Sequence, residues 1–234
     1  MANEDQIALF DLGTGETSAE TPVVIDRDRL LTDAKLPIAP GTYQSIEEMR
    51  QHCSACYRCC LGETRTQVVV GEGNPQALIM IVGEGPGQTE DETGRPFVGR
   101  SGELLDKILA SVNLTRAEDV FICNVVKCRP PENRDPKPAE IEACKGFLLE
   151  QIRLVDPKII LLTGKVAMLT LLGIKQGITK VRGQWIEQDN RWYMPIFHPA
   201  YLLRNQSREK GSPKWLMWQD IQAVRTKLEE FRSG

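Results

Sequence analysis

Four stretches of the chain are almost continuously apolar and end in turn-forming or polar residues. They are residues 77–87 (ALIMIVGEGPG), 120–128 (VFICNVVKC), 157–164 (PKIILLTG) and 191–200 (RWYMPIFHPA). A short apolar run bounded by turn signals is typical of a strand that is buried on both faces, as in a parallel sheet. The pattern therefore predicts four main strands.

Helical periodicity separates these strands along the chain. It predicts helices over residues 45–56, 101–114, 137–155, 165–173 and 212–232. The third of these has proline near its start and acids in its first turn, which are favourable at a helix N-terminus. Strands that alternate with helices predict an α/β fold, a three-layer α/β/α sandwich around a central, mainly parallel four-stranded sheet.

Charge divides the chain into an acidic extension and a mildly basic body. Residues 1–50 hold ten Asp or Glu and four Lys or Arg, a net of −6; the whole chain is −3, so the remainder is −3 − (−6) = +3. We expect residues 1–45 to form a loosely ordered extension, at most with a short helix, and residues 46–234 to form the folded domain. A basic body suits a phosphate-bearing partner, and it suits an ordinary solvated surface equally well.

The chain carries no sign of a membrane or secretory role. No apolar run approaches the ~20 residues that a membrane span needs, and no basic region precedes the short apolar stretch near the start. We therefore expect a cytoplasmic protein without a membrane partner. In that reducing compartment, clustered cysteines more often bind metal or do redox chemistry than form disulfides.

Four of the seven cysteines lie within residues 52–60 (HCSACYRCC). They offer two overlapping CxxC pairs, Cys53 with Cys56 and Cys56 with Cys59. Cys128 and Cys144 flank a proline-rich loop that can bring their thiols to one point. Zinc and an iron–sulfur cluster both accept four cysteines, and the spacing does not choose between them. The remaining Cys123 lies in an alternating strand pattern and is interpreted as a core residue.

Polar residues stand where the predicted strands end, which is where sites form in parallel sheets. Glu84 lies inside the glycine turn GEGPG, Asn124 ends the second strand, and His198 follows the fourth. The turn is not a phosphate-binding P-loop, because the GK[ST] ending is absent. Phe97 lies in a loop where an aromatic ring is more often a hydrophobic anchor; we favour a stacking platform because of its neighbours. The amide of Asn124 can read the edge of a base.

Three motifs together carry a family resemblance: GEGPGQTEDETGRPFVGRSG (83–102), CNVVKCRPPENRDPKPAEIEAC (123–144) and HPAYLLRN (198–205). In this order they resemble the family 4 uracil-DNA glycosylases, the iron–sulfur type of bacteria and archaea. The resemblance runs from about Cys56 to Trp218. It implies a DNA-repair hydrolase that flips uracil out of DNA and cleaves its N-glycosidic bond, leaving an abasic site in base excision repair.

The resemblance also implies a structural [4Fe–4S] cluster. Counting back from the RTQVVVGEGNP segment places the first pair of ligands on Cys56 and Cys59, and the second pair falls on Cys128 and Cys144. On this register Cys53 and Cys60 are additional thiols. A pair formed by Cys53 and Cys56 is the alternative.

The same resemblance implies roles for individual residues. Phe97 stacks on uracil, Asn124 reads its edge, and the backbone of the turn at Gly83 and Gly85 contacts the base. His198 stabilises the negative charge that develops on uracil O2.

The remaining roles concern the sugar and the DNA. Glu84 is our candidate for stabilising the sugar cation and positioning water, with Glu90 as the second choice. The segment formed by Tyr201, Leu202, Leu203 and Arg204 contacts DNA, with Leu202 as the wedge.

Two other functions remain open from the sequence alone. A zinc- or cluster-stabilised nucleic-acid-binding protein without hydrolytic activity would need the cysteines but not the residues at the strand ends. An iron–sulfur electron carrier would be a small cluster domain with a redox partner surface. We expect a monomer that acts on uracil-containing DNA, with DNA-repair or replication proteins as further partners.

Overall fold

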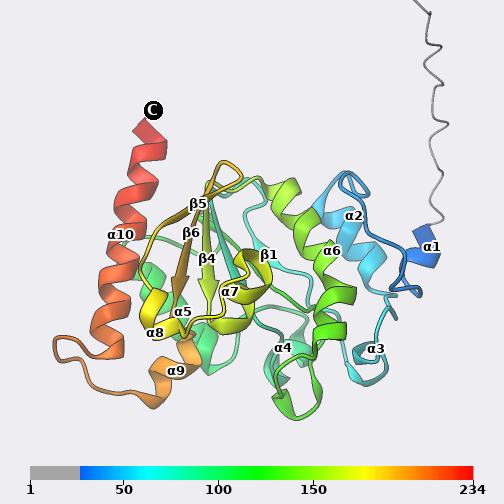
Figure 1. Cartoon of the computed structure of the whole chain (residues 1–234), viewed down its shortest axis with the longest axis horizontal. Coiled ribbons are helices and arrows are strands. Elements are labelled where there is room, and N and C mark those ends of the chain that lie inside the picture. Colours follow the sequence, from blue (N-terminus) through cyan, green and yellow to red (C-terminus); the bar gives the residue numbers. More distant parts are fainter. Residues whose placement is uncertain (1–26, 234) are drawn as a thin grey trace, which may run out of the picture.

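The computed structural model describes residues 27–233, which form a single six-stranded sheet between helices (Figure 1). The strand order is β1-β3-β2-β4-β6-β5. The strands are β1 Glu72–Gly73, β2 Ile79–Gly83, β3 Val120–Asn124, β4 Ile159–Thr163, β5 Ile186–Gln188 and β6 Arg191–Ile196. β3, β2, β4 and β6 are parallel, as predicted, whereas β1 and β5 are short antiparallel edge strands. The sheet is therefore mixed and larger than the four strands expected.

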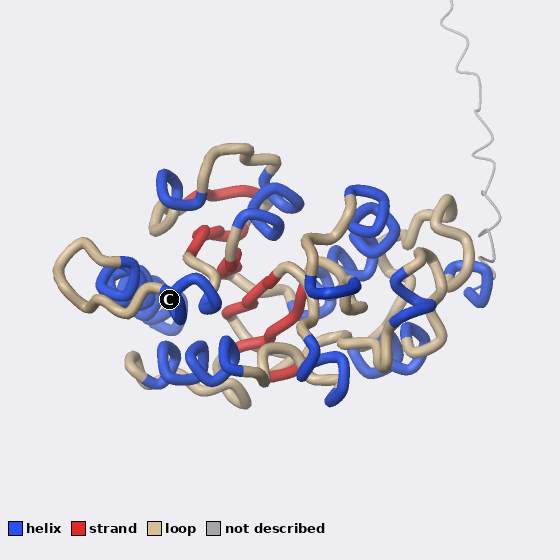
Figure 2. The backbone as a smooth tube through the Cα atoms, turned by 90° about the horizontal axis from the view of Figure 1, so that it is seen from below, coloured by secondary structure: helices blue, strands red, loops and turns tan. Residues whose placement is uncertain are grey.

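The two faces of the sheet are covered by different helices, which makes three layers (Figure 2). Side chains of alternate strand residues point to opposite faces, so Met80 and Val82 belong to one core and Ile79 and Ile81 to the other. The first core contains residues of α6 (Pro138–Val155) and α7 (Lys165–Leu172). The second contains residues of α5 (Arg100–Ala110), α9 (Pro199–Arg204) and α10 (Pro213–Ser233). The predicted three-layer α/β/α architecture is confirmed.

The remaining helices are short, apart from α2. They are α1 Arg27–Leu30, α2 Ile46–Cys53, α3 Leu61–Thr64, α4 Gln88–Thr93, the 3₁₀ turn η1 Pro131–Asn133 and α8 Ile178–Val181. The predicted helices correspond to α2, α5, α6, α7 and α10. Among residues 27–233, no helix combines the length and the apolar character that crossing a membrane requires.

Residues 27–45 are part of the folded body, which corrects the boundary expected at residue 45. Leu31, Ile38 and Tyr43 are buried in a third core, which they share with residues of α2 and α6. The guanidinium of Arg58, itself buried, donates to the carbonyl oxygens of Leu30, Asp33, Ala34 and Leu36. A short apolar set and one arginine thus fix a segment whose composition looked disordered. Residues 1–26, the rest of the expected extension, lie outside the described residues.

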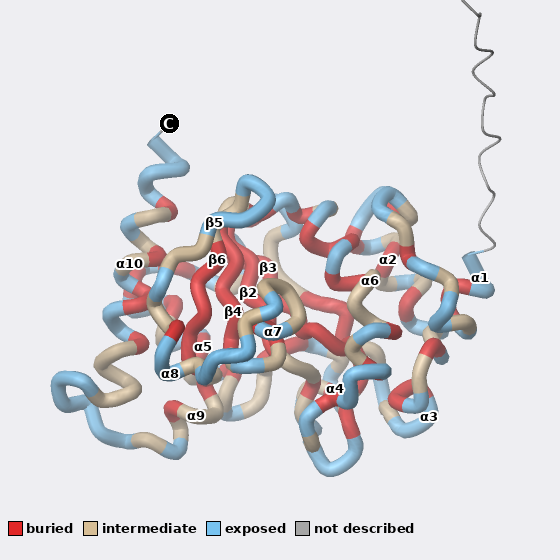
Figure 3. The backbone as a smooth tube through the Cα atoms, in the orientation of Figure 1, coloured by how far each residue is buried: buried red, intermediate tan, exposed pale blue. Residues whose placement is uncertain are grey.

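The four parallel strands present their carboxyl ends at one edge of the buried sheet (Figure 3). β2 ends at Gly83 and β3 at Asn124, and the two residues are paired in register. β3 is shorter than the predicted strand 120–128. Beyond Asn124 the chain follows the glycine turn instead, because Val125 N–H donates to Gly83 O and Val126 N–H to Glu84 O.

Candidate active site

A cleft of about 730 Å³ opens at the carboxyl edge of the sheet. It is lined by most of the residues that the sequence singled out: Glu84, Gly85, Glu90, Phe97, Asn124, His198, Tyr201 and Arg204. These residues lie at or just after the ends of β2, β3 and β6, in the loop before α5, and on α4 and α9. In Figure 1, α4 and α9 lie at the same end of the sheet. The structure therefore brings the predicted residues together in one cavity.

Gly83 allows Asn124 and Phe97 to approach each other closely. A Cβ atom on Gly83 would lie 2.3 Å from Asn124 Oδ1 and 2.6 Å from Phe97 Cζ. Asn124 is 1% exposed, and its Oδ1 has no hydrogen-bond partner among the described residues. A buried oxygen without a partner is costly, so this amide is prepared to accept a hydrogen bond from a ligand.

Phe97 and His198 present neighbouring rings to the cleft. Phe97 is 5% exposed and adopts a left-handed backbone conformation with φ 51°. Its ring centroid lies 5.7 Å from that of His198, and the ring planes are inclined by 30°. A bulky residue with positive φ is an outlier that neighbouring structure must hold in place. Here Arg116 donates to the carbonyl oxygens of Pro96 and Phe97.

His198 is held as a neutral hydrogen-bond donor. It is the N-cap of α9, where its Nδ1 accepts from the backbone N–H of Ala200 at 3.1 Å. In a neutral imidazole the proton then resides on Nε2. Burial, followed by the positive charge of Arg204, lowers the pKa of His198 to about 4, against a smaller opposite effect of Glu90. The ring is therefore uncharged at neutral pH.

The two candidate carboxylates stand in different environments. Burial raises the pKa of Glu84 to about 7, and Asp135 adds to the rise through its charge and a hydrogen bond. Both oxygens of Glu90 are engaged by backbone N–H groups: Val98 and Gly99 donate to Oε1, and Gly87 donates to Oε2. Glu90 thus holds the loop in front of α5, and Glu84 is the carboxylate open to chemistry.

The segment after His198 is divided between the core and the cleft. Tyr201 and Arg204 line the cleft. Leu202, chosen from the sequence as the wedge, is 1% exposed and packed in the core with α5 and α10. A side chain that fills the core cannot also enter DNA, so that choice is corrected. Leu203 is half-buried, so it is the leucine of this segment that remains a candidate for contacting DNA.

Sequence reasoning missed four charged residues of the cleft: Arg100, Arg134, Asp135 and Lys165. Lys165 follows Gly164 directly after β4, a strand end that the apolar pattern had located without assigning it a function. Arg100 begins α5 just after the loop that carries Phe97. Asp135 lies within the proline-rich loop between Cys128 and Cys144. The spacing of these cysteines in the sequence did not determine the path of the loop.

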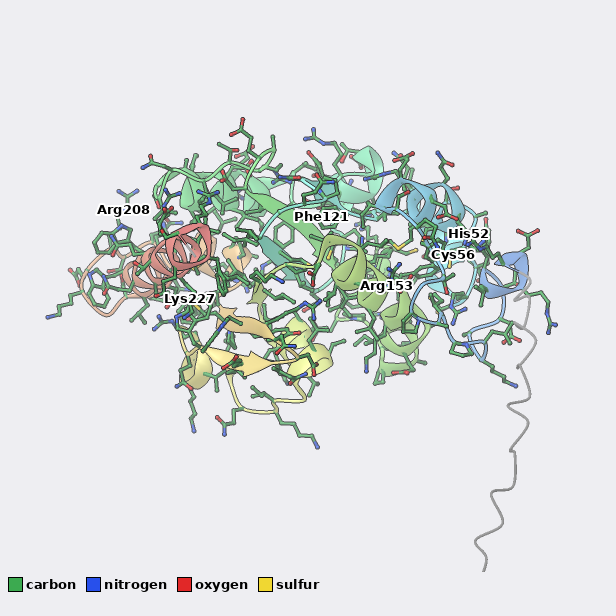
Figure 4. The ribbon with its side chains drawn as sticks, turned by 90° about the horizontal axis from the view of Figure 1, so that it is seen from above. His52, Cys56, Phe121, Arg153, Arg208 and Lys227 are labelled. Carbon is green, nitrogen blue, oxygen red and sulfur yellow. The ribbon has the colours of Figure 1, made fainter. Side chains whose placement is uncertain are left out.

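Five cysteines gather around a second, much smaller cavity of about 20 Å³, which shares no lining residue with the cleft. They are Cys53, Cys56, Cys59, Cys128 and Cys144. Figure 4 shows Cys56 beside His52, at the end of the molecule away from the C-terminal helix that carries Lys227. Burial raises the pKa of Cys128 to about 12 and that of Cys144 to about 11. These thiols are therefore neutral unless a bound cation displaces their protons.

The other two cysteines lie away from this cavity. Cys60 is exposed, and its thiol donates to Glu140 Oε1 at 3.4 Å. Cys123 is 0% exposed within β3 and belongs to the sheet core, as its alternating pattern indicated. Among residues 27–233, no three His, Cys, Asp or Glu side chains are arranged to hold a single metal ion.

Lys127 connects the two cavities. It lines the cysteine cavity, is 2% exposed, and its backbone N–H donates to Cys144 Sγ at 3.3 Å. Its Nζ donates to Asn124 O and to Gln151 Oε1, both at 2.5 Å. The backbone behind the cleft amide is thus held by a buried cation that borders the cysteines.

Comparison with known proteins places this arrangement in one family. Residues 70–222 match the model of the uracil DNA glycosylase superfamily. A type-4 uracil-DNA glycosylase of Thermotoga maritima is 51% identical over 166 residues, which is 70% of this chain and 86% of that protein. One of Archaeoglobus fulgidus is 41% identical, over 71% of this chain and 88% of that protein. A type-5 enzyme of Pyrobaculum aerophilum is 28% identical, over 77% and 84% respectively. The chain therefore belongs to the uracil-DNA glycosylase superfamily, alongside its type-4 members.

Proposed function

We infer that this protein is a hydrolase that releases uracil from DNA and leaves an abasic site, the first step of base excision repair. One observation carries the proposal: Phe97, Asn124 and His198 converge on one buried wall of the cleft. They supply an aromatic face, an amide with an unpaired acceptor and a neutral N–H donor. A flipped pyrimidine needs this combination.

Asn124 would distinguish uracil from cytosine by its hydrogen-bond pattern. Its unpaired Oδ1 can accept from uracil N3–H, while its Nδ2 donates to uracil O4. Cytosine presents an acceptor at N3 and a donor at the neighbouring position, so both bonds would be lost. Phe97 would stack on the base. The close approach at Gly83 and the backbone of Gly85 would complete the base pocket.

His198 would stabilise the departing base. As the glycosidic bond breaks, negative charge develops on uracil O2, and a preorganised donor in a water-poor site stabilises such charge. The hydrogen bond from Ala200 N–H to Nδ1 leaves the Nε2 proton for this purpose. A neutral imidazole also avoids the desolvation cost of a buried charge.

Glu84 would act on the sugar side of the reaction. The sugar develops oxocarbenium character, which a nearby carboxylate stabilises while it also orients the attacking water. Glu84 opens to the cleft from the glycine turn and can take this role when it is charged. Glu90 would support it by holding the loop through three backbone N–H groups.

The rim of the cleft supports the docking of a DNA backbone. Arg100, Lys165 and Arg204 contribute cationic groups to its lining, and such groups bind phosphates without reading sequence. Tyr201 and Leu203 would fill the gap that the flipped nucleotide leaves, which offsets a few kcal/mol of unstacking.

We propose that Cys56, Cys59, Cys128 and Cys144 hold a [4Fe–4S] cluster. Their thiols surround one cavity but are not arranged for a single ion, and a cluster with several metal atoms can take one thiolate on each. Its contribution would be a rigid link between the segment before α3 and the loop before α6. The separation of the two cavities supports this structural role. Cys53 lines the same cavity, so it stays the alternative to Cys59.

Base release tests the function. An end-labelled single-stranded oligonucleotide with one uracil is incubated with cluster-loaded protein and then treated with alkali. We expect cleavage at the uracil, none on the matched cytosine oligonucleotide, and a loss of cleavage in Asn124→Ala and His198→Ala. The control is Glu132→Gln, which changes an exposed residue outside the cleft.

Retention of the oligonucleotide without cleavage would instead favour a nucleic-acid-binding protein without hydrolytic activity. The expectations of a monomer, of a cytoplasmic location and of DNA-repair or replication partners stay predictions.

A further inference from the structure

The cysteine cavity is lined by three cationic residues and, among residues 27–233, by no carboxylate. The cations are Arg58, Arg65 and Lys127. A cysteine binds metal as the thiolate, so a centre with four cysteine ligands gathers four negative charges in this small space. Positive charge beside the sulfur atoms favours the charged form of each thiol. The three cations therefore belong to the electrostatics of the proposed cluster.

Two of the three cations spend their side chains on oxygen atoms. The guanidinium of Arg58 donates to carbonyl oxygens of residues 30–36 and of α6. The ammonium group of Lys127 donates to one carbonyl oxygen and one amide oxygen. Within the part of the chain that the structure describes, Arg65 is the residue whose cationic side chain donates to a sulfur atom: its Nη1 lies 3.7 Å from Cys128 Sγ.

Arg65 also connects the two halves of the cysteine site. The same Nη1 donates to the carbonyl oxygen of Cys56 at 2.5 Å, and Nη2 donates to that of Ser54 at 3.2 Å. Cys56 belongs to the segment before α3, whereas Cys128 lies beyond the end of β3. One guanidinium thus contacts one cysteine from each of the two proposed ligand pairs.

Gly62 and Tyr57 shape the place that this guanidinium occupies. A Cβ atom on Gly62 would lie 2.8 Å from Arg65 Nη1, so a larger residue there would push the guanidinium aside. The ring centroid of Tyr57 lies 4.9 Å from Arg65 Cζ, and Tyr57 is itself 57% exposed. An aromatic face attracts a cation, and a ring in place of water strengthens the interaction of that cation with nearby charge. The exposed ring of Tyr57 therefore serves as a cover for Arg65.

We propose that Arg65 is a positioning residue of the cysteine site, which holds Cys56 and Cys128 at the proposed cluster and directs its positive charge at the sulfur atom of Cys128. The proposal rests on the proposed cluster and does not depend on base release. Arg65 is not itself a ligand, because a guanidinium stays protonated and has no lone pair to offer. It acts through the two cysteines that it contacts.

The sign of the charge effect follows from the electron count. Reduction of the bound cluster by one electron from an external reductant adds one negative charge to the site. A cation that donates to a coordinating sulfur stabilises the more negative form, so it raises the reduction potential. Removing the cation lowers the potential, whereas loss of a contact that only held the backbone would leave the potential in place.

The first test is a spectroelectrochemical titration of iron-loaded protein, followed through the visible absorbance of the cluster. At the midpoint potential of wild type, we expect the ratio of reduced to oxidised cluster to be about tenfold lower in Arg65→Gln, a shift of about 59 mV for one electron. Arg65→Lys keeps the charge and should shift less. Arg208→Gln removes the same charge from an exposed position at the opposite end of the molecule from Cys56 (Figure 4), and it should leave the potential unchanged.

A wild-type potential in Arg65→Gln would overturn the proposal and leave the cluster assignment intact. If Arg65→Gln keeps too little iron for a titration, Tyr57→Ala replaces it, because that change exposes the guanidinium to water and keeps every cysteine. We expect a smaller shift toward lower potential in Tyr57→Ala, and an unchanged potential there would equally overturn the proposal.

The second test measures how firmly the site holds iron, without a change in the charge of the cluster. The loss of visible absorbance is followed in an excess of an iron chelator. We expect Arg65→Gln to lose iron about tenfold faster than wild type. Arg65→Lys should fall between the two, since one ammonium group lacks the planar fork of a guanidinium.

Equal rates of iron loss in Arg65→Gln, Arg208→Gln and wild type would contradict the proposed contact with both cysteines. A wild-type protein that binds no iron would overturn the proposed cluster together with this role of Arg65. Neither measurement uses DNA, so a failure of the proposed base release would change neither result.

Discussion

Replacement of Gly83 by alanine tests the geometry of the cleft with a single methyl group. The new Cβ would lie 2.3 Å from Asn124 Oδ1, whereas ordinary contacts span 3.4–4 Å. To reach an ordinary contact the amide must retreat by 3.4 − 2.3 = 1.1 Å, and the Phe97 ring, at 2.6 Å from the same Cβ, by 3.4 − 2.6 = 0.8 Å. Gly83 has no positive φ, so its backbone accepts alanine and the effect is steric alone.

The size of the effect follows from these displacements. A misplacement of about 1 Å in a catalytic site costs on the order of 100-fold in rate. Overpacking costs about 1–3 kcal/mol of stability, and each kcal/mol lowers the melting temperature by about 2–4 °C in a protein of this size. We therefore expect Gly83→Ala to remain folded at room temperature and to excise uracil about 100-fold more slowly than wild type.

The assay is single-turnover excision from a single-stranded uracil oligonucleotide, with the melting temperature measured on the same samples. Gly177→Ala is the matched control. Its backbone φ is −65°, and the nearest atom to its Cβ would be Thr179 Oγ1 at 3.8 Å. We expect this control to excise at the wild-type rate. A Gly83→Ala protein with wild-type excision would show that Asn124 and Phe97 do not form the base pocket as described.

Three further predictions concern other parts of the molecule. Arg58→Ala leaves several carbonyl oxygens of residues 27–45 without a donor, so it should cost about 3 kcal/mol of unfolding free energy in urea titrations and expose that segment to proteolysis; an unchanged midpoint would contradict the anchoring. Cys60→Ser should retain the iron and visible absorbance of wild type, whereas Cys59→Ser should lose them, and the reverse result would move the ligand assignment. His198→Ala should slow excision by about 10²–10³-fold. Because the pKa of His198 is about 4, titration of this ring should cause no change in the rate of excision between neutral pH and about pH 5. The pH–rate profile is measured on the Glu84→Gln protein, in which Glu84 cannot titrate in that range.

The sequence predicts the centre of the fold better than its margins. The four parallel strands are buried on both faces, so each leaves an uninterrupted apolar run in the sequence. The edge strands β1 and β5 have two and three residues and leave no such signal. Residues 27–45 are ordered by a few buried apolar side chains and by the donors of Arg58, contacts that no local pattern reveals.

The site shows the same division. Strand ends can be read from the sequence, so Asn124 and His198 could be located before the fold was known. The orientation of a side chain within a short helix cannot, which is why Leu202 was assigned to DNA although it faces the core. Asp135 could not be found because its place depends on a loop whose path is fixed by an ion pair and two cysteines.

Lys127 forms a short mechanical route from the cysteines to Asn124, the residue proposed to read the base. Asn124 and Cys128 are four residues apart, so the chain between them spans at most about 14 Å, and the ammonium group of Lys127 fastens the intervening carbonyl. The side chain of Asn124 is therefore tied to the cysteine cavity through four residues of backbone and one ammonium group. If the proposed cluster occupies that cavity, we expect its removal to slow excision before it lowers the unfolding midpoint of the sheet.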